Sequence, residues 1–199
     1  RLTTKFGLLT AAAALSALIA LVGVSRLVLL RHFAALDQEH ASASLRLLHA
    51  LVRAEQDGIA SLMRDWSEWD DCWKFVRGQD QEFAAANLQA NGFANNGLDL
   101  AAFFDAQGRI TTLCLYDRHA EALVDGSGLR IILESTPALH RFTEAGQEAL
   151  GALPLPDGGA LLVAAGPVLP SSGEGEIGGA LVFGRLLDRP LLIMSEPGT

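Results

Sequence analysis

The hydrophobic pattern changes along the chain and divides it into three segments. Residues 6–25 form an uncharged, mostly apolar run with basic residues on both sides. At about 1.5 Å of rise per residue, a helix of that length spans the roughly 30 Å of a bilayer core. From residue 31 to residue 76 the apolar positions are spaced as in an amphipathic helix, and after that strand-like and helix-like patterns follow one another. We therefore predict a transmembrane segment over residues 1–31, a helical stalk over 32–60 and a folded domain over 61–199.

A cleaved signal peptide is the alternative for the first segment, and the alanines at 11–14 keep it open. Against it, residues 27–30 extend the apolar run without a small-residue cleavage site. Basic residues at both ends leave the orientation weakly defined. The part of the chain after the apolar segment is acidic and has few lysines, which is typical of an exported domain. We expect an inner-membrane protein whose chain is extracytoplasmic, or periplasmic, from about residue 32 onward.

Residues 31–76 contain no proline and one glycine, Gly58, and their apolar positions recur at spacings of three to five. This pattern predicts a long amphipathic helix. Such a helix would be roughly 65–70 Å long, which is too long to bury in a domain of this size. Its first half is expected to pair with the same helix of a second copy in a homodimer. Whether the helix is continuous through Gly58 stays open.

The remainder predicts strands with short helices. Gly78 ends the long helix in a left-handed conformation, a short helix is expected over 80–90, and the glycines in 91–97 indicate turns. Residues 128–134 fit a strand or a helix, and 147–153 favour a helix. Further expected features are a hairpin of 98–105 and 109–116, a closing hairpin of 160–168 and 177–186, and a last helix capped by Asp188.

These elements predict an α+β fold, in which a small antiparallel sheet with flanking helices follows the long helix. That arrangement is typical of PAS-like sensor domains, although a fold does not by itself establish a function. The net charge of −8 and a pI of about 5.0 argue against nucleic acid as a partner, because such binding needs a basic face. No phosphate-binding loop, zinc spacing or nucleophile elbow is present, so we expect neither catalysis nor a metal or cofactor.

All three tryptophans lie within the nine residues 65–73, together with four carboxylates. In a continuous helix Trp66, Trp69 and Trp73 would share one narrow stripe, with Asp70 at its edge. In one interpretation this stripe docks the helix on the sheet, and Asp70 accepts hydrogen bonds from backbone or indole N–H groups. In the other, the stripe lines a pocket for a small cationic or polar ligand, held by charge and cation–π attraction.

Two arginines complete the candidate site. Arg185 lies late in an apolar strand, where an unpaired charge is costly, so Asp70 or Asp105 is its expected partner unless the strand end is exposed. Arg118 follows the first hairpin, in a connection that is either a ligand contact or a solvated loop. The candidate ligand-binding residues are therefore Trp66, Trp69, Asp70, Trp73, Arg118 and Arg185. Cys72 and Cys114 could form a disulfide or remain two buried thiols.

The block at 65–71, followed by Trp73 and by Phe75 and Val76, resembles the fourth subfamily of CHASE domains. Cys72 departs from the pattern, where a residue such as threonine is expected. The likeness covers about residues 60 to 195 and continues in order through Phe83, Asn87, Leu88, Phe104, Asp105, Gly108, Arg109, Ile110, Ala164 to Val168, Gly178 to Arg185, and Asp188.

The resemblance implies a sensor region of a bacterial transmembrane signalling protein. It would receive an unknown small-molecule or protein signal and regulate a cytoplasmic output that these residues do not include. That output would be a diguanylate cyclase or phosphodiesterase of cyclic-di-GMP signalling, or a histidine kinase. The alternatives are a membrane-anchored interaction scaffold without a ligand pocket and the sensor of a chemoreceptor. The resemblance carries over no catalytic residue.

Overall fold

The computed structural model describes residues 45–156 and 158–187, together with residues 16, 18, 21 and 26. Contacts group the chain into two units, residues 1–50 and 51–199. In the first unit, residues 45–50 are helical and mostly exposed. Among the residues described, no helix is both long and apolar enough to cross a bilayer. Nearly all of the predicted membrane segment, residues 32–44 of the predicted stalk and the predicted helix after Asp188 lie outside the described residues.

The long helix is described from residue 45 to residue 67 and passes through Gly58 without interruption. It does not continue to residue 76 as predicted. The backbone of Trp69 is extended (φ −105°, ψ 127°), and a separate helix, α2 (Asp70–Val76), begins after it. A tertiary contact accompanies this break: the backbone N–H of Leu169 donates to the carbonyl oxygen of Ser67 at 2.8 Å. Helix propensity depends on the local sequence alone, so it could not predict that this tertiary contact accompanies the end of the helix.

The centre of the domain is a six-stranded antiparallel sheet with the order β3-β2-β1-β6-β5-β4. The strands are β1 (Leu100–Asp105), β2 (Ile110–Asp117), β3 (Ala122–Val124), β4 (Ala149–Pro154), β5 (Ala160–Val168) and β6 (Gly179–Leu186). Both predicted hairpins, β1–β2 and β5–β6, are confirmed. They join through antiparallel pairing of β1 with β6, in which Leu100 lies opposite Gly184. Segments far apart in the sequence thus become neighbours.

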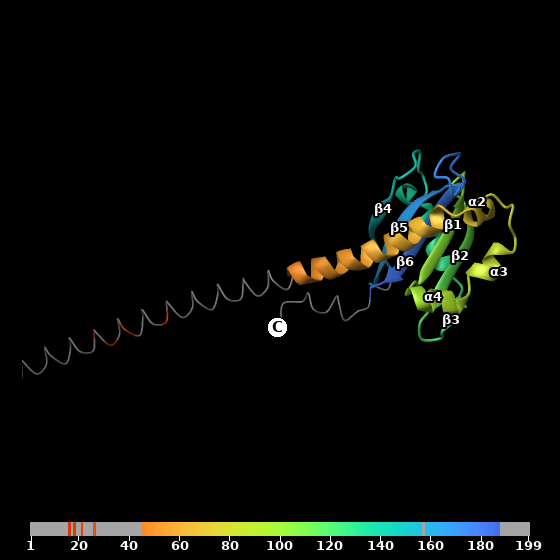
Figure 1. Cartoon of the computed structure of the whole chain (residues 1–199). Coiled ribbons are helices and arrows are strands. Elements are labelled where there is room, and N and C mark those ends of the chain that lie inside the picture. The colour runs from red at the N-terminus through yellow and green to blue at the C-terminus, as the bar shows by residue number, and fades with distance from the viewer. Residues whose placement is uncertain are drawn as a thin grey trace, which may run out of the picture. The chain divides into compact units, whose positions relative to one another are not determined.

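The sheet separates two hydrophobic cores, because successive side chains of a strand point to opposite faces. On one face Ala101, Phe103 and Phe183 pack against the long helix, α2, α3 (Phe83–Asn87) and α4 (Ala90–Asn96). On the other face Phe104 and Val182 pack with α5 (Ser127–Glu134) and the 3-10 helix η1 (Pro137–Leu139). Figure 1 shows the long helix and α2 lying across the first face.

Several predicted elements differ from the structure. The segment 147–153 was expected to favour helix, but its residues from Ala149 onward belong to β4, whose burial alternates with the period of a strand as it pairs with β5. The turn expected at 91–92 lies inside α4, which ends at Gly97 with φ of +61°. The predicted helix over 80–90 is shorter, as α3. Residues 128–134, left open between strand and helix, belong to α5.

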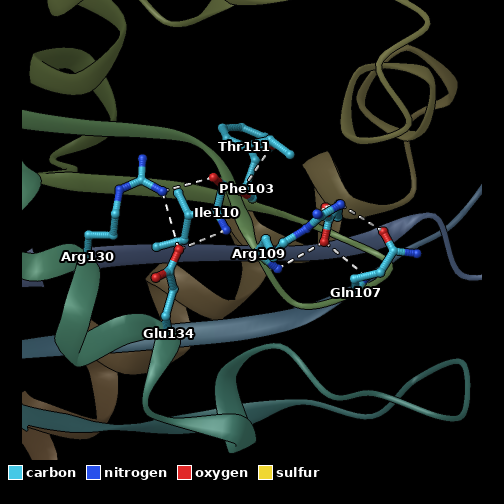
Figure 2. A network of polar contacts seen from close by, with 8 residues as sticks. Phe103, Gln107, Arg109, Ile110, Thr111, Arg130 and Glu134 are labelled. Carbon is cyan, nitrogen blue, oxygen red and sulfur yellow. Dashed lines mark hydrogen bonds and ion pairs between the residues drawn. The ribbon is translucent and has the colours of Figure 1, made fainter.

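Polar contacts attach α5 to the first hairpin (Figure 2). Arg130 Nη1 donates to the carbonyl oxygen of Ile110 at 2.9 Å, and the Ile110 N–H donates to Glu134 Oε1 at 3.3 Å. The turn itself is held by Asp105, which accepts hydrogen bonds from the backbone N–H and the guanidinium of Arg109 at 2.9 Å. The contacts of Arg130 and Glu134 attach the β1–β2 hairpin to α5 on the face of the sheet opposite the long helix, while those of Asp105 stabilise the turn itself.

Candidate functional site

The tryptophan block lies in the contact between the long helix and the sheet. Trp66 is half-buried, and its ring centroid lies 5.4 Å from Phe183 on β6 and 6.1 Å from Phe83 on α3, both in edge-to-face geometry. Trp69 is 38% exposed and packs edge-on against Trp66 at 6.0 Å. The helix is interrupted at Trp69. The three rings therefore do not form the single helical stripe that the sequence predicted. They contribute to an aromatic cluster that docks the helix.

Asp70 and Trp73 contact the loop between β5 and β6. Asp70 Oδ1 accepts a hydrogen bond from the backbone N–H of Ser171 at 2.8 Å. The indole N–H of Trp73 donates to the carbonyl oxygen of Glu176 at 3.0 Å, and the Arg77 guanidinium lies 4.5 Å above the indole ring. These contacts agree with the docking interpretation, in which Asp70 accepts a backbone N–H. None of these residues lines the large cavity described below.

A cavity of the described domain lies beside the other two candidates, Arg118 and Arg185. It has a volume of about 640 Å³ and is partly open to solvent. Its wall combines the long helix, the end of α4 with the residues that follow it, the end of β2 with its turn, and the end of β6. The aromatic and charged side chains of the lining are those of Glu55, Phe93, Tyr116, Arg118, Glu121 and Arg185. Arg118 and Arg185, which lie far apart in the sequence, therefore line one space.

Arg118 is fixed by a buried carboxylate. Its Nε and Nη2 donate to the two carboxylate oxygens of Asp99 at 2.6 Å each. Asp99 is 0% exposed, and Oδ2 also accepts the backbone N–H of Leu186 at 2.7 Å. A bidentate pair of this kind fixes both the position and the plane of a guanidinium. Arg118 thus lies in the turn after β2, where its partly exposed side chain is fixed as part of the cavity wall.

Arg185 is held on three sides. Its Nε donates to the carbonyl oxygen of Gly97, its Nη2 to that of Asn96 at 3.0 Å, and its Nη1 to Glu55 Oε2. The partners expected from the sequence, Asp70 and Asp105, were wrong. Asp70 contacts Ser171 and Asp105 holds the hairpin turn, whereas Glu55 comes from the long helix. The ion pair of Arg185 with Glu55 therefore links the end of β6 to that helix.

The sequence missed Glu55, Asp99 and Glu121 as site residues. Glu55 is one of several charges on the exposed part of the helical pattern, and nothing in its spacing sets it apart. Asp99 does carry a signal, because it is an acid between Leu98 and Leu100 directly before a strand. Glu121 has a positive φ of 51°, which is uncommon for a residue with a side chain, and no sequence pattern predicted it.

The two cysteines are free thiols rather than a disulfide. Cys72, on α2, is buried in the core that also contains residues of the long helix, and burial raises the pKa of its thiol to about 12. Burial also raises the pKa of Cys114. Within residues 45–156 and 158–187, histidine, cysteine and carboxylate side chains form no cluster that could hold a metal ion.

Comparison with protein families places this fold. The family model of the CHASE4 domain matches residues 51–193, a range that includes the long helix from residue 51 onward, the sheet and the residues that line the cavity. The chain belongs to the CHASE4 domain family. A CHASE4 domain is an extracellular sensor domain of histidine kinases and GGDEF signalling proteins, as the sequence resemblance implied.

Relatives of this CHASE4 chain are found in signalling proteins. It is 26% identical over 136 residues to the methanogenesis regulatory histidine kinase FilI of Methanothrix harundinacea (strain 6Ac), a match that covers 67% of this chain and 15% of FilI. Two solved structures share the fold at TM-scores of 0.55 and 0.56, with 15% and 14% identity. The first is titled the extracellular domain of a histidine kinase, and the second a domain of a sensory box/GGDEF family protein from Vibrio parahaemolyticus. Each match covers 80% of this chain, and 60% and 63% of the respective solved chains.

Proposed function

We propose that this CHASE4 chain is the extracytoplasmic sensor region of a membrane-anchored receptor, and that it regulates a cytoplasmic cyclase, phosphodiesterase or kinase encoded beyond these residues. The observation that carries the proposal is the cavity of about 640 Å³ whose wall is shared by the long helix and the sheet. A ligand in such a space contacts both bodies at once. It can therefore favour one arrangement of the helix on the sheet over another.

The coupling needs a signal that binds two arrangements with different affinity. On the sheet side the helix is held by the aromatic cluster at Trp66 and by the ion pair of Glu55 with Arg185. Because the helix is continuous from residue 45 through Glu55 and Gly58 to residue 67, a change at Glu55 or at Trp66 would be carried along it toward its N-terminal end. In our proposal that end leads to the membrane.

Three features of the receptor belong to the same proposal. The predicted span over residues 1–31 anchors the chain in the inner membrane, with the sensor outside. The PAS-like description is supported by the central pairing of the first hairpin with the last, β1 with β6. Homodimerisation through the helix is supported by Leu47 and Leu51, which follow one another at helical spacing and are 63% and 45% exposed.

Reporter fusions test the topology. Alkaline phosphatase joined after Thr199 is expected to be active, because it folds only outside the cytoplasm, and β-galactosidase at the same position is expected to be inactive. The opposite pair of activities would overturn the extracytoplasmic assignment. Both reporters need the complete chain, so the N-terminal segment is tested together with the domain.

A chimera tests regulation. The chain is followed by a second membrane span and a histidine kinase module of known activity, and phosphorylation of the kinase is measured in membranes. Trp66→Ala, which weakens the docking of the helix, is expected to shift the kinase activity. Leu150→Ala is the control, because Leu150 is 45% exposed on the edge strand β4. Equal activity of wild type, Trp66→Ala and Leu150→Ala would contradict regulation through helix docking.

A further inference from the structure

We propose that the cavity beside Arg185 binds a small molecule that carries a carboxylate group, and that this carboxylate takes the place of Glu55 on the Arg185 guanidinium. The inference rests on the proposed sensor function and assigns the chemical class of the signal and the contact that it changes. Four observations lead to it, and they concern the arginine, its partner, the second arginine and the lining.

The guanidinium of Arg185 is oriented so that it can bind an anion. Two of its donors are occupied by the backbone carbonyl oxygens of Gly97 and Asn96, which orient the guanidinium without neutralising its charge. The close approach depends on Gly97, since a Cβ at that position would lie 2.9 Å from Arg185 Nη2. A fixed guanidinium in a partly enclosed space is the group that best matches a carboxylate, because its N–H donors form a planar fork.

Glu55 is the partner that a ligand can displace. Its side chain is 43% exposed, so it can return to water at low cost, whereas the Arg185 side chain is only 24% exposed. Exposed ion pairs contribute little net stability. Exchange of one carboxylate for another leaves the charge of Arg185 compensated. The exchange therefore requires no buried, unpaired charge.

The second ion pair of the cavity is not open to the same exchange. Asp99 is 0% exposed and also accepts the backbone N–H of Leu186, so its removal from Arg118 would leave a buried carboxylate without its charge partner. Asp99 is therefore a fixed partner of Arg118, whereas Glu55 is an exchangeable partner of Arg185. Arg118 contributes a fixed positive charge to the same wall.

The lining indicates that the ligand also has an apolar part. Phe93 and Tyr116 stack at a centroid distance of 6.2 Å and face the cavity together with Leu162. A space of about 640 Å³ is within the range of small-molecule sites. The ligand class is thus a small organic acid with an aliphatic or aromatic body. Its binding would release Glu55, and with it one of the contacts that hold the long helix on the sheet.

The test compares matched acids and amides on the 199-residue chain in detergent micelles by titration calorimetry. The acids are phenylacetate, 4-methylpentanoate and leucine. Their neutral or cationic counterparts are phenylacetamide, 4-methylpentanamide and leucinamide. At least one acid is expected to bind at least about tenfold more tightly than its amide. Binding of amides as tight as that of their acids, or binding by no acid, would overturn the proposal.

Variants separate exchange from a structural role of the ion pair. Glu55→Gln is expected to tighten binding of the acid about tenfold, because it removes the competing carboxylate, and Arg185→Gln is expected to abolish it. Arg109→Gln is the matched control, since this arginine is 75% exposed in the β1–β2 turn (Figure 2). Weaker or unchanged binding in Glu55→Gln would overturn the exchange, whether or not Arg185→Gln folds. The topology reporters do not depend on this result, so failure here and failure of the sensor assignment are distinguishable.

Discussion

Asp70 and Ser171 exchange two hydrogen bonds, although 101 positions separate them in the sequence. The backbone N–H of Asp70 donates to Ser171 Oγ at 3.0 Å, and Asp70 Oδ1 accepts the backbone N–H of Ser171 at 2.8 Å. The pair joins the start of α2 to the loop after β5. It therefore lies at the point where the long helix ends and the chain changes direction, directly after the extended residue Trp69.

Acid should weaken this link. The hydrogen bond from the Ser171 backbone N–H is the main cause that lowers the pKa of Asp70 below its ordinary value. Because the pKa is lowered on folding, the stabilisation is present above the unfolded pKa of about 3.9 and is lost as the pH falls through the folded pKa. We expect Asp70→Asn to be less stable than wild type at neutral pH and to approach it in acid.

Urea denaturation across this pH range measures the Asp70 effect. Asp65→Asn is the control, because Asp65 is exposed near the end of the long helix, and this substitution is expected to change the free energy of unfolding less than Asp70→Asn does at neutral pH. A constant difference between wild type and Asp70→Asn down to the lowest pH would contradict the assignment.

The aromatic cluster predicts unequal effects of two neighbouring tryptophans. Trp66→Ala should lower the free energy of unfolding by about 3–5 kcal/mol, because it leaves a cavity against Phe83 and Phe183. Trp69→Ala should cost less, about 1–2 kcal/mol, because 38% of Trp69 is exposed. Chemical denaturation of both variants checks the order. A larger loss in Trp69→Ala would show that the docking contact is centred elsewhere.

Asp99 should be among the most sensitive polar positions. Asp99→Ala removes the carboxylate from Arg118 and leaves the backbone N–H of Leu186 unpaired, which should cost about 2–4 kcal/mol of unfolding free energy. Asp99→Asn, which keeps an acceptor oxygen for the N–H of Leu186, should cost less. Thermal denaturation with both variants checks this. Equal losses would mean that the charge of Asp99 accounts for the whole effect and that the hydrogen bond from the Leu186 N–H adds nothing.

Two glycines should respond to alanine in opposite directions. A Cβ at Gly179 would clash with the backbone carbonyl of Phe104, so Gly179→Ala must move paired strands and should cost more than about 3 kcal/mol. Gly58 is helical, and a Cβ added there would meet nothing within 4 Å, so Gly58→Ala should stabilise the domain by about 0.5–1 kcal/mol. Denaturation midpoints of both variants check the signs. Destabilisation by Gly58→Ala would indicate that the helix needs to bend there.

Alkaline pH should act through Cys72. Burial raises its pKa to about 12, so the folded state favours the protonated thiol. Its contribution is therefore complete below the unfolded pKa of about 8.5 and is lost as the pH rises through the folded value. Iodoacetamide should label Cys72 only when the domain unfolds, as followed by mass spectrometry against denaturant concentration. Rapid labelling of Cys72 in the folded chain at about pH 8, near the ordinary thiol pKa, would contradict its burial.

The local pattern determined the elements whose signals are contained in a short stretch. Strands β1, β5 and β6 follow from apolar runs bounded by turns, and Asp105 to Gly108 form the predicted turn because Gly108 takes a positive φ of 76°. The tryptophan block indicated the family, and docking of the helix on the sheet was one of the two interpretations that the block left open. The predictions were wrong where tertiary contacts outweighed local propensity. The segment expected to favour helix is a strand, β4, which pairs with β5, and the long helix ends early at its contact with the β5–β6 loop.

Only the tertiary structure decided the cavity. Arg118 and Arg185 were each candidates in the sequence, but their common location depends on the pairing of β1 with both β2 and β6. Their true partners, Asp99 and Glu55, lie 19 and 130 positions away from them. The preference of an arginine for a carboxylate is local chemistry and can be read from a sequence. Which carboxylate lies within reach depends on how distant segments pack, and short-range hydrophobic periodicity carries no information about that.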